Sequence, residues 1–166
     1  HNALVGCGLR EKVRLGASGK ITSAFHMARI MALGADWCNS ARGFMFAVGC
    51  IQAQSCHTGL CPTGVTSPDP LRQRAIVVPD KAERVANFHR NTLQALAELV
   101  AAAGLSHPSQ LQPHHFMRRA SSDHVISFAE QYELLLPGQL LGGAAVPPRF
   151  ATAWSQSSSS SFQRMG

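Results

Sequence analysis

The first third of the chain alternates short apolar runs with helical patterns. Val13, Leu15 and Ala17 occupy every second position of "KVRLGAS", which predicts a short buried strand ending near Ser18. Residues 21–36 place apolar side chains at helical spacing and carry a glycine near their end. This second segment therefore predicts an amphipathic helix.

A second strand and a second helix follow directly. "ADWCNS", residues 35–40, predicts a short strand, and "ARGF", residues 41–44, leads into the apolar helix "MFAVGC". The order strand, helix, strand, helix predicts parallel strands joined by right-handed crossovers. The expected fold class is α/β.

The pattern changes in the second half of the chain. Residues 62–79 are rich in proline and turn residues and predict an extended surface loop. Residues 80–103 carry an apolar stripe and predict a long helix, and residues 121–136 predict another. Residues 141–166 are low in complexity and predict a disordered tail.

Composition narrows the class of protein. The 166 residues are 45% apolar and 14% charged, as in a globular domain. We expect no membrane partner, because no apolar stretch reaches about 18 residues, and a cytoplasmic location, where thiols stay reduced. We expect no nucleic-acid partner despite the formal net charge of +6, because the basic residues are scattered without interleaved aromatic residues. The start at His1, inside an apolar segment, indicates a fragment.

Three of the five cysteines, Cys50, Cys56 and Cys61, lie within a dozen residues, and proline follows the last. Thiolates from one loop can each bind one iron of an iron–sulfur cluster, and a proline follows the final ligand of ferredoxin-type runs. Zinc with His57 as fourth ligand is a second interpretation, although adjacent ligands rarely fit one tetrahedral ion. Three inert buried thiols are a third. Cys7, on an expected opening strand, and the strand residue Cys38 lie outside this run.

Two glycine-containing turns follow the predicted strands. "LGASGKIT" is not a nucleotide P-loop, because Arg14 replaces its first glycine and Ile21 replaces the magnesium-binding hydroxyl. "ASGK", residues 17–20, and "SARG", residues 40–43, instead offer backbone N–H groups and the Arg42 guanidinium to a phosphate. An ordinary pair of tight turns is the alternative.

Together, "GASGKITSAFHMARIMALGADWCNSARGFMFAVGC" and "CIQAQSCHTGLCPTGV" resemble the FMN-binding domain of the glutamate synthase family. Its members share the glycine turn, the helix ending "LGA" and the cysteine spacing. The resemblance implies the C-terminal part of a (β/α)8 TIM barrel, its last two βα units, followed by an iron–sulfur loop and a helical appendage. The expected domains are the barrel part at 1–49, the iron–sulfur loop and extended wrap at 50–79, the helical appendage at 80–140 and the disordered tail at 141–166.

The resemblance also implies cofactors, partners and a reaction. The cofactors are FMN and a [3Fe-4S] cluster that passes electrons to it, for the reductive amination of 2-oxoglutarate to L-glutamate. Glutamine or ammonia would supply nitrogen, and ferredoxin or an NADPH-oxidising subunit would supply electrons. By matching position, the cluster ligands are Cys50, Cys56 and Cys61. The phosphate-binding residues are Ser18, Gly19, Lys20, Ser40, Ala41 and Arg42. No catalytic residue is assigned.

This chain departs from the family in length. A barrel needs about 250 residues, and the upstream strands that supply most flavin and substrate contacts in the family are absent. The assignment therefore describes an oxidoreductase parent enzyme, and the chain alone is expected to be inactive. A small zinc-stapled interaction module and an inactive truncated fragment are the alternative functions.

Overall fold

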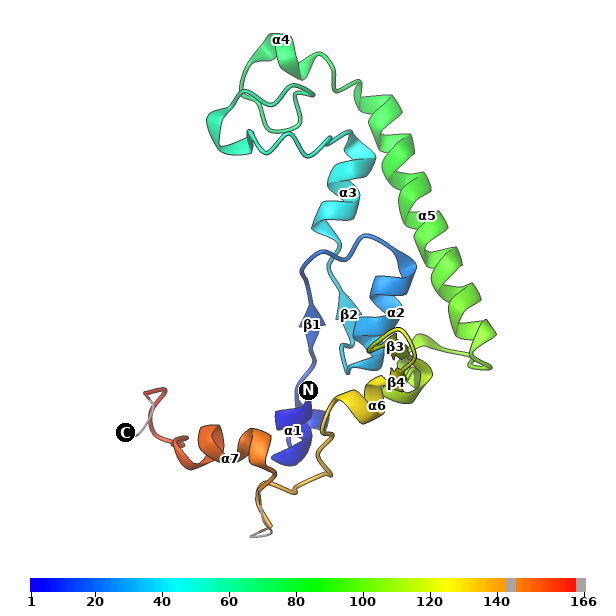
Figure 1. The fold of residues 1–166 in the computed structure, drawn as a ribbon. Coiled ribbons are helices and arrows are strands. Elements are labelled where there is room, and N and C mark those ends of the chain that lie inside the picture. The colour runs from blue at the N-terminus through cyan, green and yellow to red at the C-terminus, as the bar shows by residue number, and fades with distance from the viewer. Residues whose placement is uncertain (143–145, 164–166) are drawn as a thin grey trace. The chain divides into compact units, whose positions relative to one another are not determined.

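A computed structural model of the chain describes residues 1–142 and 146–163 (Figure 1). The chain forms two compact units, one comprising His1–Leu15 with Gln112–Gly166 and the other Gly16–Leu111. The described residues contain two two-stranded sheets and no closed barrel. The domain boundaries expected after residues 49, 79 and 140 fall inside these units, and that division stays a prediction.

The unit Gly16–Leu111 contains most of the regular structure. Its elements are β1 (Gly16–Ala17), α2 (Ala24–Ala32), β2 (Trp37–Cys38), α3 (Ala41–Val48), α4 (Pro70–Gln73) and α5 (Val78–Ala102). β1 and β2 pair in parallel, with Gly16 opposite Trp37 and Ala17 opposite Cys38. The predicted order strand, helix, strand, helix and the predicted long helix are therefore confirmed. The first strand is shorter and less buried than predicted, because Val13 and Leu15 lie outside β1 and Val13 is exposed. Helix α3 begins at Ala41, inside the segment "ARGF" that was expected to be a turn.

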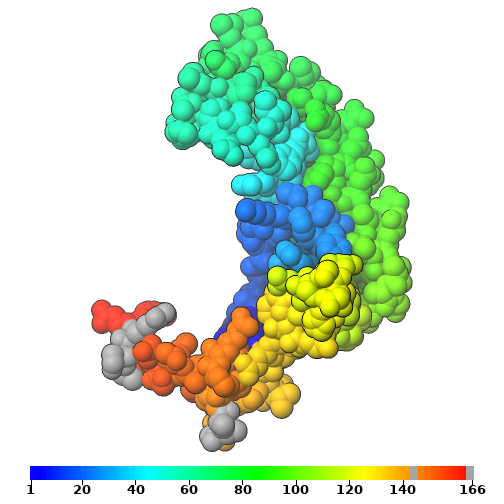
Figure 2. Space-filling model, viewed as in Figure 1, coloured from blue at the N-terminus to red at the C-terminus, as the bar shows by residue number. Residues whose placement is uncertain are grey.

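Helix α5 packs against both α2 and α3, as the adjoining green, blue and cyan segments show (Figures 1 and 2). Small side chains let the helices pack closely. Ala28 of α2 is one of them, and it is only 1% exposed. On α3, Gly43 leaves room for α5, because a Cβ at this position would lie 2.7 Å from the ring of Phe88 on α5. The Phe88 ring meets that of Phe44 edge-on at 5.2 Å. Leu96 and Val100 of α5 are also buried.

The other unit joins the two ends of the chain. Its elements are α1 (Asn2–Gly6), β3 (Met117–Arg119), β4 (Val125–Ser127), α6 (Phe128–Gln131) and α7 (Pro148–Ser155). β3 and β4 form an antiparallel hairpin. The backbone N–H of Gly138 donates to the Val5 carbonyl at 3.0 Å, and that of Leu140 donates to the Gly6 carbonyl at 2.9 Å. None of the described helices is both long and apolar enough to cross a membrane.

Several expected elements are wrong. The helix expected over 121–136 is a hairpin strand followed by α6, because β-branched Val125 and Ile126 favour a strand and Ser127 forms a capping box with Glu130 that starts the helix later. The opening segment expected as a strand is α1.

Two loop predictions also need correction. The segment 62–79 expected as extended contains α4, whose first turn is capped by Asp69 and begins with Pro70. The tail 141–166, expected to be disordered, contains α7. Its residues 143–145 and 164–166 lie outside the described residues.

Candidate phosphate site and cysteine loop

The turns that follow β1 and β2, called here the strand-end turns (residues 18–20 and 39–42), lie side by side because the strands pair in parallel. Asn39 donates its backbone N–H to the Ala17 carbonyl at 2.8 Å and so extends the pairing by one residue. The Ser40 hydroxyl donates to the carbonyl of buried Ile21 at 2.6 Å. The second turn is therefore joined to the residues on either side of the first.

The strand-end turns carry features that suit an anion. Gly19 has a φ of +103°, which favours glycine, and a Cβ placed there would meet no described atom within 4 Å. Its backbone is therefore open to a ligand. Ser40 precedes α3 but uses its hydroxyl on Ile21, and among the described residues no side chain caps the first turn of α3. Uncapped backbone N–H groups at a helix start bind anions, and Lys20 and Arg42 add positive charge.

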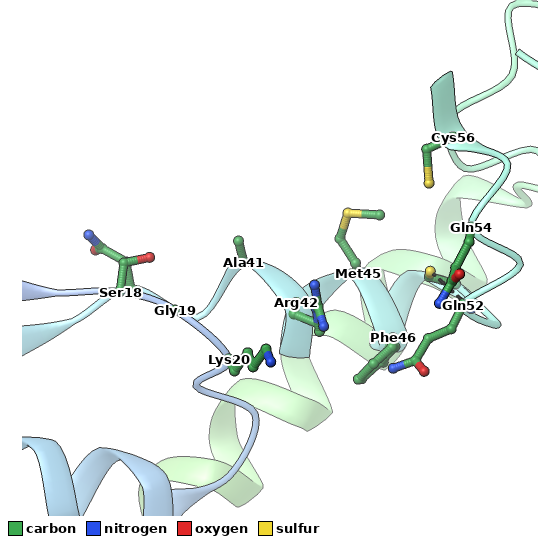
Figure 3. A pocket seen from close by; sticks show the side chains of 12 residues that line it. Ser18, Gly19, Lys20, Ala41, Arg42, Met45, Phe46, Gln52, Gln54 and Cys56 are labelled. Carbon is green, nitrogen blue, oxygen red and sulfur yellow. Dashed lines mark hydrogen bonds between the residues drawn. The ribbon is translucent and has the colours of Figure 1, made fainter. Parts of the chain in front are cut away.

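One cavity of about 450 Å³ joins the strand-end turns to the cysteines (Figure 3). Figure 3 shows Lys20 on the side of the strand ends, Cys56 on the other side and Arg42 on α3 between them. Five of the six predicted phosphate-binding residues line it, all except Ser40 among the described residues, together with two of the three predicted cluster ligands. The full lining is Ser18, Gly19, Lys20, Asn39, Ala41, Arg42, Met45, Phe46, Cys50, Gln52, Gln54 and Cys56.

The cysteine loop (residues 50–64) begins directly at the end of α3. The backbone N–H of Cys50 donates to the Met45 carbonyl at 3.0 Å, which ties the first cysteine to the helix. Gly49 makes this turn with a φ of +123°. The backbone N–H of Gln52 then donates to the Cys50 sulfur at 3.5 Å. The first thiol therefore already has a hydrogen-bond donor.

The other two cysteines of the loop differ from each other. Cys61 is buried, and its sulfur lies 3.4 Å from the Thr63 hydroxyl. Hydrogen bonds from Thr63 and then Thr66 lower the pKa of the Cys61 thiol to about 6. Cys56 lies in the 3₁₀ turn Cys56–Thr58 and is exposed. One thiol is thus poised as a thiolate inside the fold, and the other faces solvent.

The cysteine loop fits an iron–sulfur cluster in the chemistry of its donors. All five cysteines of the chain are free thiols. Cys38, on β2 and outside the loop, differs from Cys61 because burial raises the pKa of its thiol. Within the described residues, no three His, Cys, Asp or Glu side chains lie close enough to hold a single metal ion. The ligands of a cluster bind different irons and so lie farther apart than those of one zinc ion. The Cys50 sulfur accepts a backbone N–H and the Cys61 sulfur lies beside the Thr63 hydroxyl. Hydrogen bonds of this kind tune the sulfur ligands of iron–sulfur clusters.

Positive side chains lie on both sides of Cys50. Lys20 and Arg42 share the first cavity with it, and a second cavity of about 440 Å³ is lined by Cys50, Lys81 and Arg84. The Lys81 ammonium lies 3.4 Å from an Asp80 carboxylate oxygen, which balances part of its charge. The surroundings of Cys50 therefore suit a negatively charged occupant.

The sequence patterns missed several residues of the cavity. Gln52 and Gln54 have φ values of 58° and 57°, a conformation uncommon outside glycine, and Figure 3 shows both side chains at the cavity. The available signal was the pair of glutamines at alternate positions of "GCIQAQSC". Met45 and Phe46 line the same space from α3.

The comparisons with known proteins all indicate the same family. Residues 1–106 match a family model described as a conserved region in glutamate synthase. The chain is 42% identical over 120 residues to the glutamate synthase large subunit-like protein YerD of Bacillus subtilis, across 72% of this chain and 23% of that protein. It is 40% identical over 80 residues to ferredoxin-dependent glutamate synthase 1 of Arabidopsis thaliana, across 48% of this chain and 5% of that protein. An archaeal NADPH glutamate synthase of Methanocaldococcus jannaschii is 33% identical over 99 residues, 60% of this chain and 19% of that protein.

The chain belongs to the glutamate synthase family. The predicted resemblance is therefore confirmed. The chain spans less than a quarter of the length of these relatives. No solved structure matches it significantly.

Proposed function

We propose that this chain is the C-terminal part of the FMN-binding region of a glutamate-synthase-type oxidoreductase. It would supply the last two βα units of a (β/α)8 barrel, the iron–sulfur loop and a helical appendage. The observation that carries the proposal is the single cavity that joins the strand-end turns to Cys50 and Cys56. Its volume of about 450 Å³ lies in the usual range of cofactor sites.

The strand-end turns would bind the FMN phosphate. The open backbone of Gly19 allows a phosphate oxygen to approach closely, and Lys20 and Arg42 neutralise the dianion. Ala41 offers a backbone N–H of the first turn of α3. Ser40 holds the two turns together through its bond to the Ile21 carbonyl. Ser18 completes the lining on the β1 side.

The cysteine loop would hold a [3Fe-4S] cluster through Cys50, Cys56 and Cys61. When bound, FMN and the cluster supply the electron transfer for reductive amination of 2-oxoglutarate to L-glutamate. The residues of this chain bind and orient the two groups, and the catalytic acid and base are not assigned to it. Relatives are named for ferredoxin and for NADPH, so one of these is the proposed electron source. Glutamine or ammonia is the proposed source of nitrogen.

Flavin titration of the full-length protein tests the phosphate site. A charge-assisted contact is worth about 1.5–3 kcal/mol, so Arg42→Ala should weaken FMN binding about ten- to a hundredfold. Riboflavin lacks the phosphate, and its affinity should stay unchanged in the same variant. Arg90→Ala on the exposed face of α5 is the matched control. An equal loss for FMN and riboflavin would remove Arg42 from the phosphate site.

Anaerobic reconstitution with iron and sulfide tests the cluster. The expected result is about three irons per chain, with visible absorption that a chelator bleaches. Binding of one zinc ion without iron or sulfide would contradict the proposal and favour the zinc-stapled module.

A further inference from the structure

Helix α4 is joined to the cysteine loop by one arginine. The Arg72 guanidinium nitrogen Nη1 lies 3.3 Å from the Leu60 carbonyl oxygen and 3.5 Å from the Cys61 carbonyl oxygen. These are successive carbonyls of the backbone that carries the third cysteine. A cation that donates to both restrains the position of Cys61 directly.

Arg72 is itself oriented by an ion pair with Asp69, which is held in turn by a short series of hydrogen bonds. Its Nε lies 3.6 Å from Asp69 Oδ2, while Asp69 Oδ1 accepts from the backbone N–H of Leu71 at 2.9 Å and caps α4. The backbone N–H of Asp69 donates to the Ser67 hydroxyl at 3.2 Å, and that hydroxyl donates to the Gly59 carbonyl at 2.6 Å. Ser67 and Arg72 therefore donate to the three successive carbonyls of Gly59, Leu60 and Cys61.

The backbones of α4 and the loop also meet closely. Gly64 has a φ of +76°, and a Cβ there would overlap the backbone carbonyl of Arg72. The Gln73 side-chain amide donates to the Ser67 carbonyl at 3.0 Å. Helix α4 thus lies directly on the loop around Cys61.

The same support is lacking at Cys56 within the described part of the chain. Its turn is closed by bonds inside the loop, from the backbone N–H and the hydroxyl of Thr58 to the Ser55 carbonyl at 3.1 and 2.7 Å. Cys50, in contrast, is tied to α3. The three thiols therefore differ in what fixes them.

We propose that Arg72, oriented by Asp69, is a positioning residue that holds Cys61 in place before the cluster forms. Cys50 and Cys61 are then a preorganised pair of ligands, and Cys56 joins them last. Fixing two ligands in advance lowers the entropy lost when the cluster is bound. The inference rests on the proposed cluster site and adds a residue to it.

The experiment compares wild type, Arg72→Met and Arg72→Lys in the full-length protein, with Arg74→Met as control. Arg74 lies two residues further on, is exposed and carries the same charge. Hydrogen exchange of the metal-free protein reports on the amides of residues 59–64. The rate at which a chelator extracts iron from the reconstituted protein reports on ligand positioning.

Arg72→Met should speed exchange over 59–64 by about three- to tenfold and leave the amides of α5 unchanged, as expected for a partly exposed charged hydrogen bond. Iron extraction should accelerate by a similar factor, Arg72→Lys should recover part of the loss, and Arg74→Met should match wild type. Asp69→Asn keeps an acceptor for the Leu71 N–H but removes the charge beside Arg72. It should shift both rates in the same direction by less.

Unchanged exchange over 59–64 in Arg72→Met would overturn the inference. Faster exchange with unchanged iron extraction would also overturn it, because Arg72 would then be a structural contact alone. An equal effect of Arg74→Met would assign the result to net charge and not to position. If wild type holds no iron and sulfide, the proposed cluster fails, while the metal-free exchange comparison still decides whether Arg72 holds Cys61.

Discussion

The two sides of the main cavity are built in different ways. The strand-end turns are held by the backbone bond from Asn39 to Ala17 and by the bond from the Ser40 hydroxyl to the Ile21 carbonyl. The cysteine loop is held mainly by side-chain bonds from α4 and the residues before it, and of its three cysteines only Cys61 is buried.

The strand-end turns therefore form a preorganised site, whereas the cysteine loop would be completed by its ligand. The turns follow from the pairing of two strands and need no ligand to bring their N–H groups together. The loop leaves Cys56 exposed and forms no single-ion site in the described residues. Part of the free energy of cluster binding would therefore order the loop, as in other small metal-binding segments. Variants in the two regions should accordingly have separable effects.

The largest expected effect is the loss of the cluster in Cys56→Ser. A serine hydroxyl is a poor substitute for a thiolate ligand, so iron and sulfide per chain should fall to background after reconstitution. Cys7→Ser is the matched control, because Cys7 is also a free thiol but lies at the end of α1, outside the loop. Its iron content should equal that of wild type. Equal iron in the two variants would contradict the assignment of Cys56.

The elements around the strand-end turns could be predicted because each has its own pattern. The alternation that ends at Ala17 indicated where β1 lies, although Val13 and Leu15 fall outside the strand. The helical spacing of α2 is a local signal, and parallel pairing then places the two turns together. Their proximity to the cysteines follows because α3 leads directly from one to the other. Binding of FMN there stays a prediction.

The parts that could not be predicted depend on contacts distant in sequence or on short apolar runs. Val125 and Ile126 lie in a stretch that also suits a helix, and pairing with β3 decides for a strand. The left-handed backbone of Gln52 has no local signature, since glycine and asparagine are the usual residues there. The bond of Arg72 to the Cys61 carbonyl joins residues eleven positions apart in the sequence, and no periodicity encodes it.

The second prediction tests how tightly α4 lies on the loop. Gly64→Ala adds a Cβ against the Arg72 carbonyl in a left-handed conformation, so the local free energy of opening over the loop should fall by about 2–4 kcal/mol. Gly104→Ala is the control, because Gly104 has a φ of +74° but no described atom within 4 Å of its Cβ. It should cost about 1–2 kcal/mol from conformation alone. Hydrogen exchange measures both, and equal costs would mean that the close approach is absent.

The third prediction compares one thiol from each region. The pKa of Cys61 is lowered to about 6, so its thiolate persists above that pH and is lost as pH falls through it. The pKa of Cys38 is raised by burial, so its thiolate forms only at high pH. Iodoacetamide labelling of the metal-free protein, followed peptide by peptide, should therefore show a midpoint near pH 6 for Cys61 and a rate still rising at pH 9 for Cys38. Thr63→Val should move the Cys61 midpoint upward, and coincident midpoints for the two thiols would refute the contrast.

The smallest effects come from two serines that make the same bond in the two regions. Ser40 donates to the Ile21 carbonyl and Ser67 donates to the Gly59 carbonyl, both at 2.6 Å. Either change to alanine removes one hydrogen bond worth about 0.5–1.5 kcal/mol. Ser40→Ala should therefore weaken FMN binding about two- to tenfold with normal iron retention. Ser67→Ala should instead speed iron extraction by a similar factor with normal FMN affinity. If each variant changed both measurements equally, the two sides of the cavity would have to be a single cooperative unit, and the difference between them would disappear.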